Sequence, residues 1–124
     1  MIHLEGPVIH GRGASKGLGY PTANIRYVPV PGATLESGVW TAYVWAQEKR
    51  CDAVAIVGVW KQSDGSPSVE VHLFDFDRDL YDTILKVDLV ERFKGLTVCP
   101  NFEALKQQIT MDATQARVRL RLSS

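Results

Sequence analysis

Residues 11–24 combine several residue types that bind phosphate groups and metal ions in proteins. Four glycines in this segment allow backbone N–H groups to turn toward an anion, and the basic side chains of Arg12 and Lys16 add positive charge. Thr22 and Asn24 contribute hydroxyl and amide oxygens, which are hard donors of the kind that magnesium accepts. The segment therefore predicts a site for the phosphates of a nucleotide.

Three better-known patterns do not fit this segment. A P-loop requires Lys directly after its last glycine, and neither Gly17 nor Gly19 is followed by Lys. The dinucleotide fingerprint requires a third glycine at the position of Lys16. Residues 13–17 match Gly-x-Ser-x-Gly, but the nucleophile elbow of esterases opens a helix, which Gly17, Gly19 and Pro21 oppose. The glycines alone also fit ordinary turns facing solvent, so the segment needs support from the rest of the chain.

Composition limits the classes of function that the chain can serve. Its 124 residues match the size of one domain, and its 14 basic and 14 acidic residues cancel. The chain therefore has no net positive charge that would attract nucleic acid or an anionic membrane, and neither is expected as a partner. The two cysteines, Cys51 and Cys99, lack the spacing of metal ligands, and no segment has the pattern of a signal peptide or a membrane span. We therefore expect a single domain over residues 1–124, a cytoplasmic and monomeric protein, and two free thiols.

Short segments with the residue types of β-strands occupy the first three quarters of the chain. Residues 68–76 alternate, which predicts that Glu70 and His72 are neighbours on one face of a sheet. Residues 25–31 contain two prolines, which favour an edge or a connection. The other expected strands are residues 4–9, interrupted by Gly6 and Pro7, residues 39–46, residues 53–60, and residues 85–93, in which Phe93 shares a buried face with Leu85.

The last part of the chain has the period of a helix instead. Asn101 is a suitable N-cap, and Glu103 places a negative charge in the first turn, where the helix dipole favours it. The apolar residues that recur at helical spacing are Leu105, Ile109, Ala113, Ala116 and Leu120. Several strands followed by one helix predict a mostly β fold, in which an antiparallel sheet curls into a small barrel and the helix covers one side.

Three motifs together resemble the riboflavin kinase family. The first is Gly-x-Gly, a basic residue and Leu-Gly-Tyr-Pro-Thr-Ala-Asn within residues 11–24. The second is Glu-x-His-Leu-x-Asp-Phe-x-x-Asp-Leu-Tyr at residues 70–81, and the third is Phe-Glu-Ala-Leu-x-x-Gln-Ile-x-x-Asp-x-x-x-Ala-Arg at residues 102–117. They occur in the order of the family and cover nearly the whole chain. The resemblance implies a closed barrel with Greek-key connections.

The resemblance also implies an activity, the transfer of the γ-phosphate of ATP to the 5′-hydroxyl of riboflavin with Mg²⁺, which gives FMN and ADP. Glu70 matches the family's general base, and Thr22 and Asn24 match its ligands to magnesium and the nucleotide phosphates. The residues expected to bind the nucleotide are Gly11, Gly13, Lys16, Gly17, Gly19, Pro21, Thr22 and Asn24. The family's bacterial members often carry a nucleotidylyltransferase domain in front, and we expect a monofunctional kinase without it.

The chain departs from the family pattern mainly where the family binds the flavin. Residues 56–62 keep only Gly58 of the family segment, and residues 93–96 read Phe-Lys-Gly-Leu in place of Leu-Arg-Pro-Glu. Asp82 replaces a glycine, and residues 14–15 replace Arg-Gly beside the nucleotide. Two alternatives therefore stay open: a kinase for a different small alcohol, and a non-catalytic module that binds flavin or nucleotide. A barrel that binds single-stranded nucleic acid is a third alternative, against which the balanced charge counts.

Overall fold

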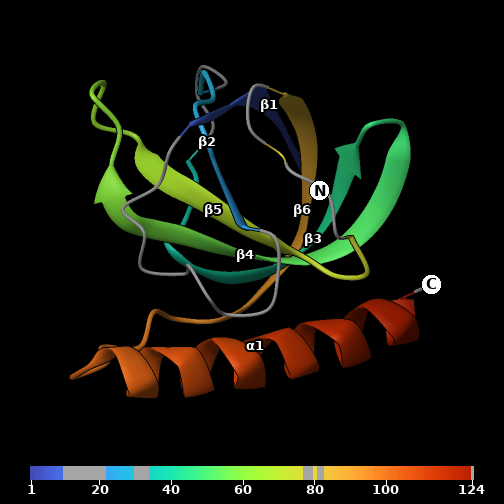
Figure 1. Ribbon diagram of the computed structural model, residues 1–124. Helices are drawn as coiled ribbons and strands as arrows, with labels where there is room; N and C mark the ends of the chain where they lie inside the picture. Colours follow the sequence, from blue (N-terminus) through green and yellow to red (C-terminus); the bar gives the residue numbers. More distant parts are fainter. Residues whose placement is uncertain (10–21, 30–33, 77–79, 81–82, 124) are drawn as a thin grey trace.

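The structure, a computed structural model, describes residues 1–9, 22–29, 34–76, 80 and 83–123. In this part of the chain, six strands precede one helix, and Figure 1 shows the strands wrapped into a barrel above that helix. The strands are β1 (Ile2–Ile9), β2 (Thr22–Ile25), β3 (Gly38–Ala46), β4 (Lys49–Lys61), β5 (Pro67–Leu73) and β6 (Ile84–Lys94), and the helix is α1 (Phe102–Ser123).

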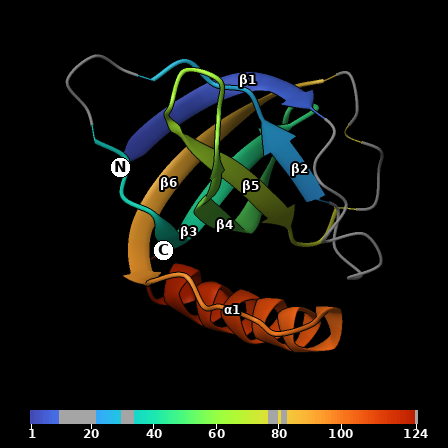
Figure 2. The same ribbon diagram turned by 90° about the vertical axis from the view of Figure 1, so that its left-hand side faces the viewer.

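The strands close into an antiparallel barrel in the order β1-β2-β5-β4-β3-β6 (Figure 2). Strands β3, β4 and β5 follow one another as neighbours, and β6 then returns to lie beside β3, which is a Greek-key arrangement. The predicted fold class, a small closed antiparallel barrel with one C-terminal helix, is confirmed.

Alternation along the strands separates the interior of the barrel from its outer face. On β5, Val69, Val71 and Leu73 are at most 1% exposed and belong to the interior core, as the sequence pattern predicts. Glu70 and His72 therefore lie on the outer face of the same strand.

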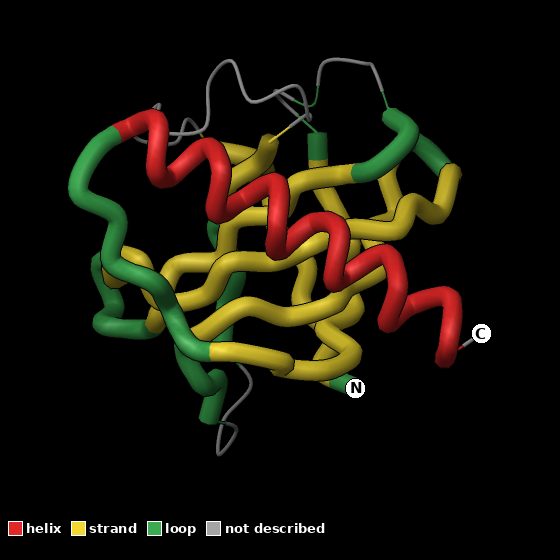
Figure 3. The backbone as a smooth tube through the Cα atoms, turned by 90° about the horizontal axis from the view of Figure 1, so that it is seen from below, coloured by secondary structure: helices red, strands yellow, loops and turns green. Residues whose placement is uncertain are grey.

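Helix α1 packs diagonally across the outer face of β3 and β4 (Figure 3). Asn101 caps it as predicted, because its Oδ1 accepts a hydrogen bond of 2.8 Å from the backbone N–H of Ala104. Ala113 and Ala116 are nearly fully buried against the sheet, and their small size lets the helix approach closely. In the described part of the chain, no helix combines the length and the apolar character needed to cross a membrane.

Two strands at the start of the chain differ from the sequence-based expectation. β2 begins at Thr22, inside the glycine-rich segment of residues 11–24, for which we expected no strand. Ala23 and Ile25 are 1% exposed and Asn24 lies between them, so a period-two pattern is present but is too short to recognise beside the glycines. β1 is continuous through Gly6 and Pro7, because Gly6 leaves room for the carbonyl oxygen of Arg26, only 2.0 Å from where a Cβ would stand.

The end of β6 also differs, because two register shifts against β3 change which side chains point inward. Leu85 is fully buried in the interior, whereas Phe93 packs on the outer face beside the helix. The expectation that the two share a face was therefore wrong. The shift between Thr41 and Ala42 inserts one residue, Val90, into β6, and this insertion reverses the alternation that Phe93 would otherwise follow.

Candidate functional site

One row of residues runs across five neighbouring strands on the outer face of the barrel. Asn24 on β2 pairs with Glu70 on β5, and Glu70 pairs with Ile56 on β4. Ile56 pairs with Val39 on β3, and Val39 pairs with Lys94 on β6. Directly opposed residues in antiparallel strands point to the same side. The row therefore brings an amide, a carboxylate, two apolar side chains and an ammonium group onto one surface.

The carboxylate of Glu70 lies against a buried histidine. The side chain of Glu70 is 20% exposed, and its Oε1 lies 2.9 Å from Nε2 of His72, which is fully buried. This contact engages one carboxylate oxygen, and no hydrogen bond from another described residue reaches Oε2. The arrangement leaves one oxygen of a partly solvent-excluded carboxylate available to accept a proton from a bound alcohol.

Asn24, directly opposite Glu70, offers an oxygen that is available to a ligand. The residue is only 4% exposed, and its Oδ1 has no hydrogen-bond partner within the described residues. Buried polar groups are normally hydrogen-bonded, so an oxygen in this state fits a position that a metal ion or a nucleotide would fill. Its chemistry also fits, since amide oxygens bind hard divalent cations.

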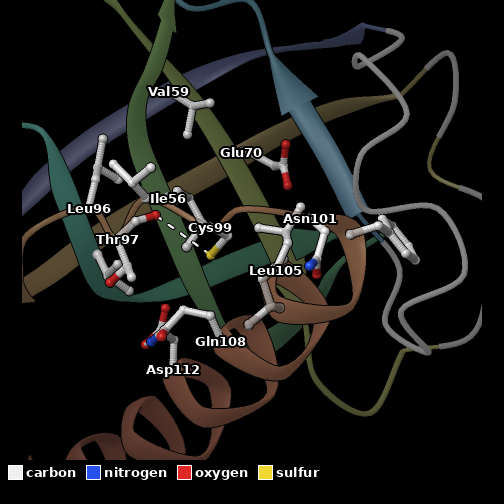
Figure 4. Close-up of a pocket in the computed structure, with 14 residues that line it drawn as sticks. Ile56, Val59, Glu70, Leu96, Thr97, Cys99, Asn101, Leu105, Gln108 and Asp112 are labelled. Atoms are coloured by element: carbon white, nitrogen blue, oxygen red, sulfur yellow. Dashed lines mark hydrogen bonds between the residues drawn. The ribbon is translucent and has the colours of Figure 1, made fainter.

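A cavity of about 540 Å³ lies between the barrel and the helix, next to Glu70. Its floor is formed by the side chains of Val39 and Ile56 from the row, and Leu105 of α1 closes it from the helix side. Figure 4 shows Glu70 at one end of this space and Gln108 and Asp112 at the other. The cavity is thus mostly apolar, with polar groups at both ends, as is typical of sites for small organic ligands.

The end of the cavity away from Glu70 is organised by a buried ion pair. Asp112 is 3% exposed, and its Oδ1 accepts a hydrogen bond of 3.0 Å from Nζ of Lys94 and one of 2.9 Å from Nε2 of Gln108. Lys94 also donates to Oγ1 of Thr97 at 3.1 Å. Lys94 therefore ties the segment after β6 to the helix, and both line the cavity.

Both thiols are free, as the sequence predicts. Cys99 is half-buried on the wall of the cavity, and its Sγ lies 3.8 Å from the carbonyl oxygen of Thr97. Cys51 lies within the interior core, and desolvation by this burial raises the pKa of its thiol. Only the thiol of Cys99 faces the candidate site.

The structure brings together Asn24 and Glu70 from the set of residues that the sequence singles out. Thr22 is described only by its backbone, which pairs with His72 on β5. The remaining predicted residues lie outside the described part of the chain: Gly11, Gly13, Lys16, Gly17, Gly19 and Pro21.

Sequence reasoning missed most of the cavity itself. No motif pointed to Val39 or Cys99 as a lining residue, although both line it. Three other lining residues, Ile56, Val59 and Leu96, come from the two segments in which the chain departs from the family pattern. These segments therefore build the wall of a cavity even though their residues have changed.

Comparisons with known proteins agree on one family. The family model described as riboflavin kinase matches residues 1–120. The chain is 36% identical over 122 residues to a bifunctional riboflavin kinase/FMN adenylyltransferase of Pseudomonas fluorescens, covering 94% of this chain and 37% of that protein. It is 28% identical over 125 residues to an RNA-binding riboflavin kinase of Bacillus subtilis, covering 98% and 53%.

Two solved structures resemble the fold of this chain. A crystal structure of a Streptococcus pneumoniae chain named as a macrolide-efflux protein matches with a TM-score of 0.74 and 30% identity, covering 89% of this chain and 36% of that one. The riboflavin kinase of Trypanosoma brucei matches with a TM-score of 0.63 and 21% identity, covering 96% and 79%, and supports the fold alone. The chain spans a little over a third of the length of the bifunctional relative from Pseudomonas.

Proposed function

The chain belongs to the riboflavin kinase family, and on this basis we propose that it transfers the γ-phosphate of ATP to the 5′-hydroxyl of riboflavin. The observation that carries the proposal is the pairing of Asn24 with Glu70 beside the cavity. In this proposal, the oxygen ligand on the nucleotide side is the neighbour of the proton acceptor on the alcohol side. A kinase requires both within one site.

Glu70 is the proposed general base. As the 5′-oxygen of riboflavin forms its bond to the γ-phosphorus, the bond from that phosphorus to the bridging oxygen of ADP breaks, and the hydroxyl proton moves to Oε2 of Glu70. The contact of 2.9 Å between Oε1 and Nε2 of the buried His72 supports this role, because a close neighbour on one side restricts the orientations open to the carboxylate. A base that is already positioned loses little entropy when the alcohol binds.

Asn24 and Thr22 are the proposed ligands on the nucleotide side, with Mg²⁺ as the ion. Mg²⁺ bound with ATP would neutralise charge on the phosphates as it develops in the transition state. The buried Oδ1 of Asn24, which lacks a partner within the described residues, supports its assignment. We also propose that the glycines of residues 11–19, Lys16 and Pro21 form the rest of the nucleotide site.

The cavity is the proposed site for riboflavin. Its apolar floor of Ile56 and Val39 suits a flat ring system, and Leu105 supplies an apolar wall on the helix side. Burial of the ring between barrel and helix would place the ribityl chain toward Glu70. The altered segments at residues 56–62 and 93–96 support this assignment, because Ile56, Val59 and Leu96 from them line the cavity.

The proposal is tested by incubating the full chain with riboflavin and Mg-ATP and separating the flavins by chromatography with fluorescence detection. We expect FMN to appear with the protein present. Glu70→Gln keeps the shape of the side chain but removes its ability to accept the proton. We expect this variant to lower turnover by two or more orders of magnitude, the usual scale for a general base.

A matched control is Glu103→Gln, which removes a carboxylate from an exposed position in the first turn of α1. We expect it to leave turnover nearly unchanged. Full activity in Glu70→Gln would remove Glu70 from the mechanism. Binding of riboflavin or nucleotide by the wild-type chain without FMN formation would reject the kinase and favour a binding module.

A further inference from the structure

Within the row on the barrel, the two polar ends of the cavity lie near Glu70 and near Lys94, with two apolar residues between them. From Glu70 on β5 the row crosses Ile56 and Val39 and ends at Lys94 on β6. Three steps between strands at about 4.8 Å each give a path on the order of 14 Å along the sheet. A ligand with a hydroxyl at Glu70 and an apolar centre would therefore present its far end to the group of Lys94, Asp112 and Gln108.

The orientation of the Gln108 amide follows from its partner. A carboxylate in an ion pair with an ammonium group only accepts hydrogen bonds, so the Nε2 end of the amide has to face Asp112. The opposite end, Oε1, is an acceptor, and no hydrogen bond to it comes from the described residues. Gln108 lines the cavity (Figure 4), and its amide is thus fixed with one hydrogen-bond acceptor left for a ligand.

We propose that Gln108 determines specificity for the acceptor substrate by accepting a hydrogen bond from the imide N–H of the flavin ring. This inference rests on the proposed function, since it takes riboflavin as the ligand. The imide N–H is the single N–H donor of the isoalloxazine ring and lies at the end away from its methyl groups. Asp112 is a positioning residue that acts through Gln108, and Lys94 holds Asp112.

The alternative is that the apolar floor recognises the ring by shape alone. Recognition by Gln108 and recognition by shape predict different effects of a methyl group on the imide nitrogen of the flavin. 3-Methylriboflavin keeps the ring, the ribityl chain and both carbonyl oxygens but lacks the donor. If Gln108 accepts from the N–H, the analogue leaves Oε1 desolvated without a partner, a loss that typically lowers affinity by about tenfold or more. If shape alone decides, the preference is independent of residue 108.

The test is equilibrium binding of riboflavin and of 3-methylriboflavin to the full chain, followed by the change in flavin fluorescence. We expect the wild-type chain to prefer riboflavin by about tenfold or more. Gln108→Met keeps the length of the side chain and removes both polar atoms. It is expected to lower the affinity for riboflavin by about tenfold, with the analogue little affected, so that the ratio approaches one.

Three further variants separate recognition from a merely structural role. Gln107→Met changes the exposed neighbour of Gln108 and should keep the wild-type ratio. Asp112→Leu frees the amide to rotate and should reduce the ratio, whereas Asp112→Asn still offers an oxygen to Nε2 and should restore most of it. In turnover assays, the loss in Gln108→Met should appear in KM for riboflavin rather than in kcat.

Each outcome decides between the inference and its alternatives. A wild-type ratio in Gln108→Met overturns the inference while leaving the kinase in place, as does an equal loss for both flavins. Thermal unfolding of each variant distinguishes a loss of fold from a loss of recognition. A wild-type chain that forms no FMN and binds no riboflavin rejects the proposed function, and the inference falls with it.

Discussion

Asn24 and Glu70 show how one pair of opposed residues joins the two halves of the site. Each lies at the middle of a strand, and their pairing is fixed by the register between β2 and β5. Opposed side chains in an antiparallel pair are about 5 Å apart at Cβ, so the proposed base and the proposed nucleotide ligand are neighbours. The proximity that the proposed phosphoryl transfer needs would therefore be provided by backbone hydrogen bonds of the barrel.

The state of Asn24 leads to a prediction at the scale of one residue. Its Oδ1 is buried without a partner within the described residues, so it contributes little to the stability of the ligand-free protein. Asn24→Ala should change the free energy of unfolding by no more than about 1 kcal/mol and should weaken binding of Mg-ATP. Denaturant unfolding and a nucleotide titration in excess Mg²⁺ measure the two effects.

Ser68 offers the matched contrast on β5. It is 1% exposed, and its Oγ accepts a hydrogen bond of 3.0 Å from the backbone N–H of Trp60. Ser68→Ala removes this buried hydrogen bond and should destabilise the fold by about 1–3 kcal/mol while nucleotide affinity is retained. The opposite result, a stable Ser68→Ala and an unstable Asn24→Ala with normal nucleotide affinity, would make Asn24 a structural residue.

The sequence identified Glu70 and Asn24 because their motifs are distinctive, and it placed Glu70 and His72 on one face because strand alternation requires it. It gave no role to Gln108 or Asp112, although both belong to the third motif. Their spacing of four residues on a helix was the available signal, since such pairs lie side by side. What the pattern could not supply was Lys94, whose approach to Asp112 depends on how the helix docks.

At the scale of elements, β4 owes its shape to Gly58. This residue has φ of +90°, and a Cβ there would lie 2.5 Å from Cβ of Ser37, just before β3. Of the family segment at residues 56–62, the sequence keeps this glycine alone, and the structure supplies the reason. The segment before β3 approaches β4 too closely for a side chain, and the backbone needs a conformation that other residues rarely adopt.

Gly65 provides a control with nearly the same backbone conformation. Its φ is +88°, and no atom lies within 4 Å of where its Cβ would stand. Gly65→Ala should therefore cost only the backbone strain, about 1–2 kcal/mol, whereas Gly58→Ala adds a steric clash and should cost about 1–3 kcal/mol more. Equal losses in urea unfolding of the two variants would show that the approach of Ser37 imposes no constraint.

The elements themselves were predictable to different degrees. Long strands such as β3 and β4 and the capped helix have strong patterns, and their positions were predicted to within a few residues. β2 has only four residues, and its identity depends on partners on both sides, β1 and β5. The reversal of alternation at Phe93 depends on register shifts against β3, which no local pattern encodes.

At the scale of the whole molecule, the row on the outer face of the barrel runs in the order Asn24, Glu70, Ile56, Val39 and Lys94. These positions are scattered along the chain, and only the Greek-key order of the strands places them side by side. Fold class follows from composition and periodicity, but strand order does not. The assembled site therefore required the structure, even though the resemblance had already named the residues at its proposed catalytic end.

The arrangement of barrel and helix predicts that the two halves of the site respond differently to a displaced helix. Ala113 is 1% exposed between α1 and the sheet and directly follows Asp112 of the cavity. The proposed nucleotide ligand Asn24 lies on β2 instead, and not on the helix. Ala113→Leu should overfill this contact, destabilise the fold by about 1–3 kcal/mol and weaken riboflavin binding, because the helix forms a wall of the cavity. Binding of Mg-ATP should change little, and Gln115→Leu, at an exposed position of the same helix, should leave both affinities unchanged.

Titrations of the Ala113→Leu variant with riboflavin and with Mg-ATP measure the two affinities separately. Equal losses for riboflavin and nucleotide would show that the helix supports the whole site. Undiminished riboflavin binding would place the flavin elsewhere.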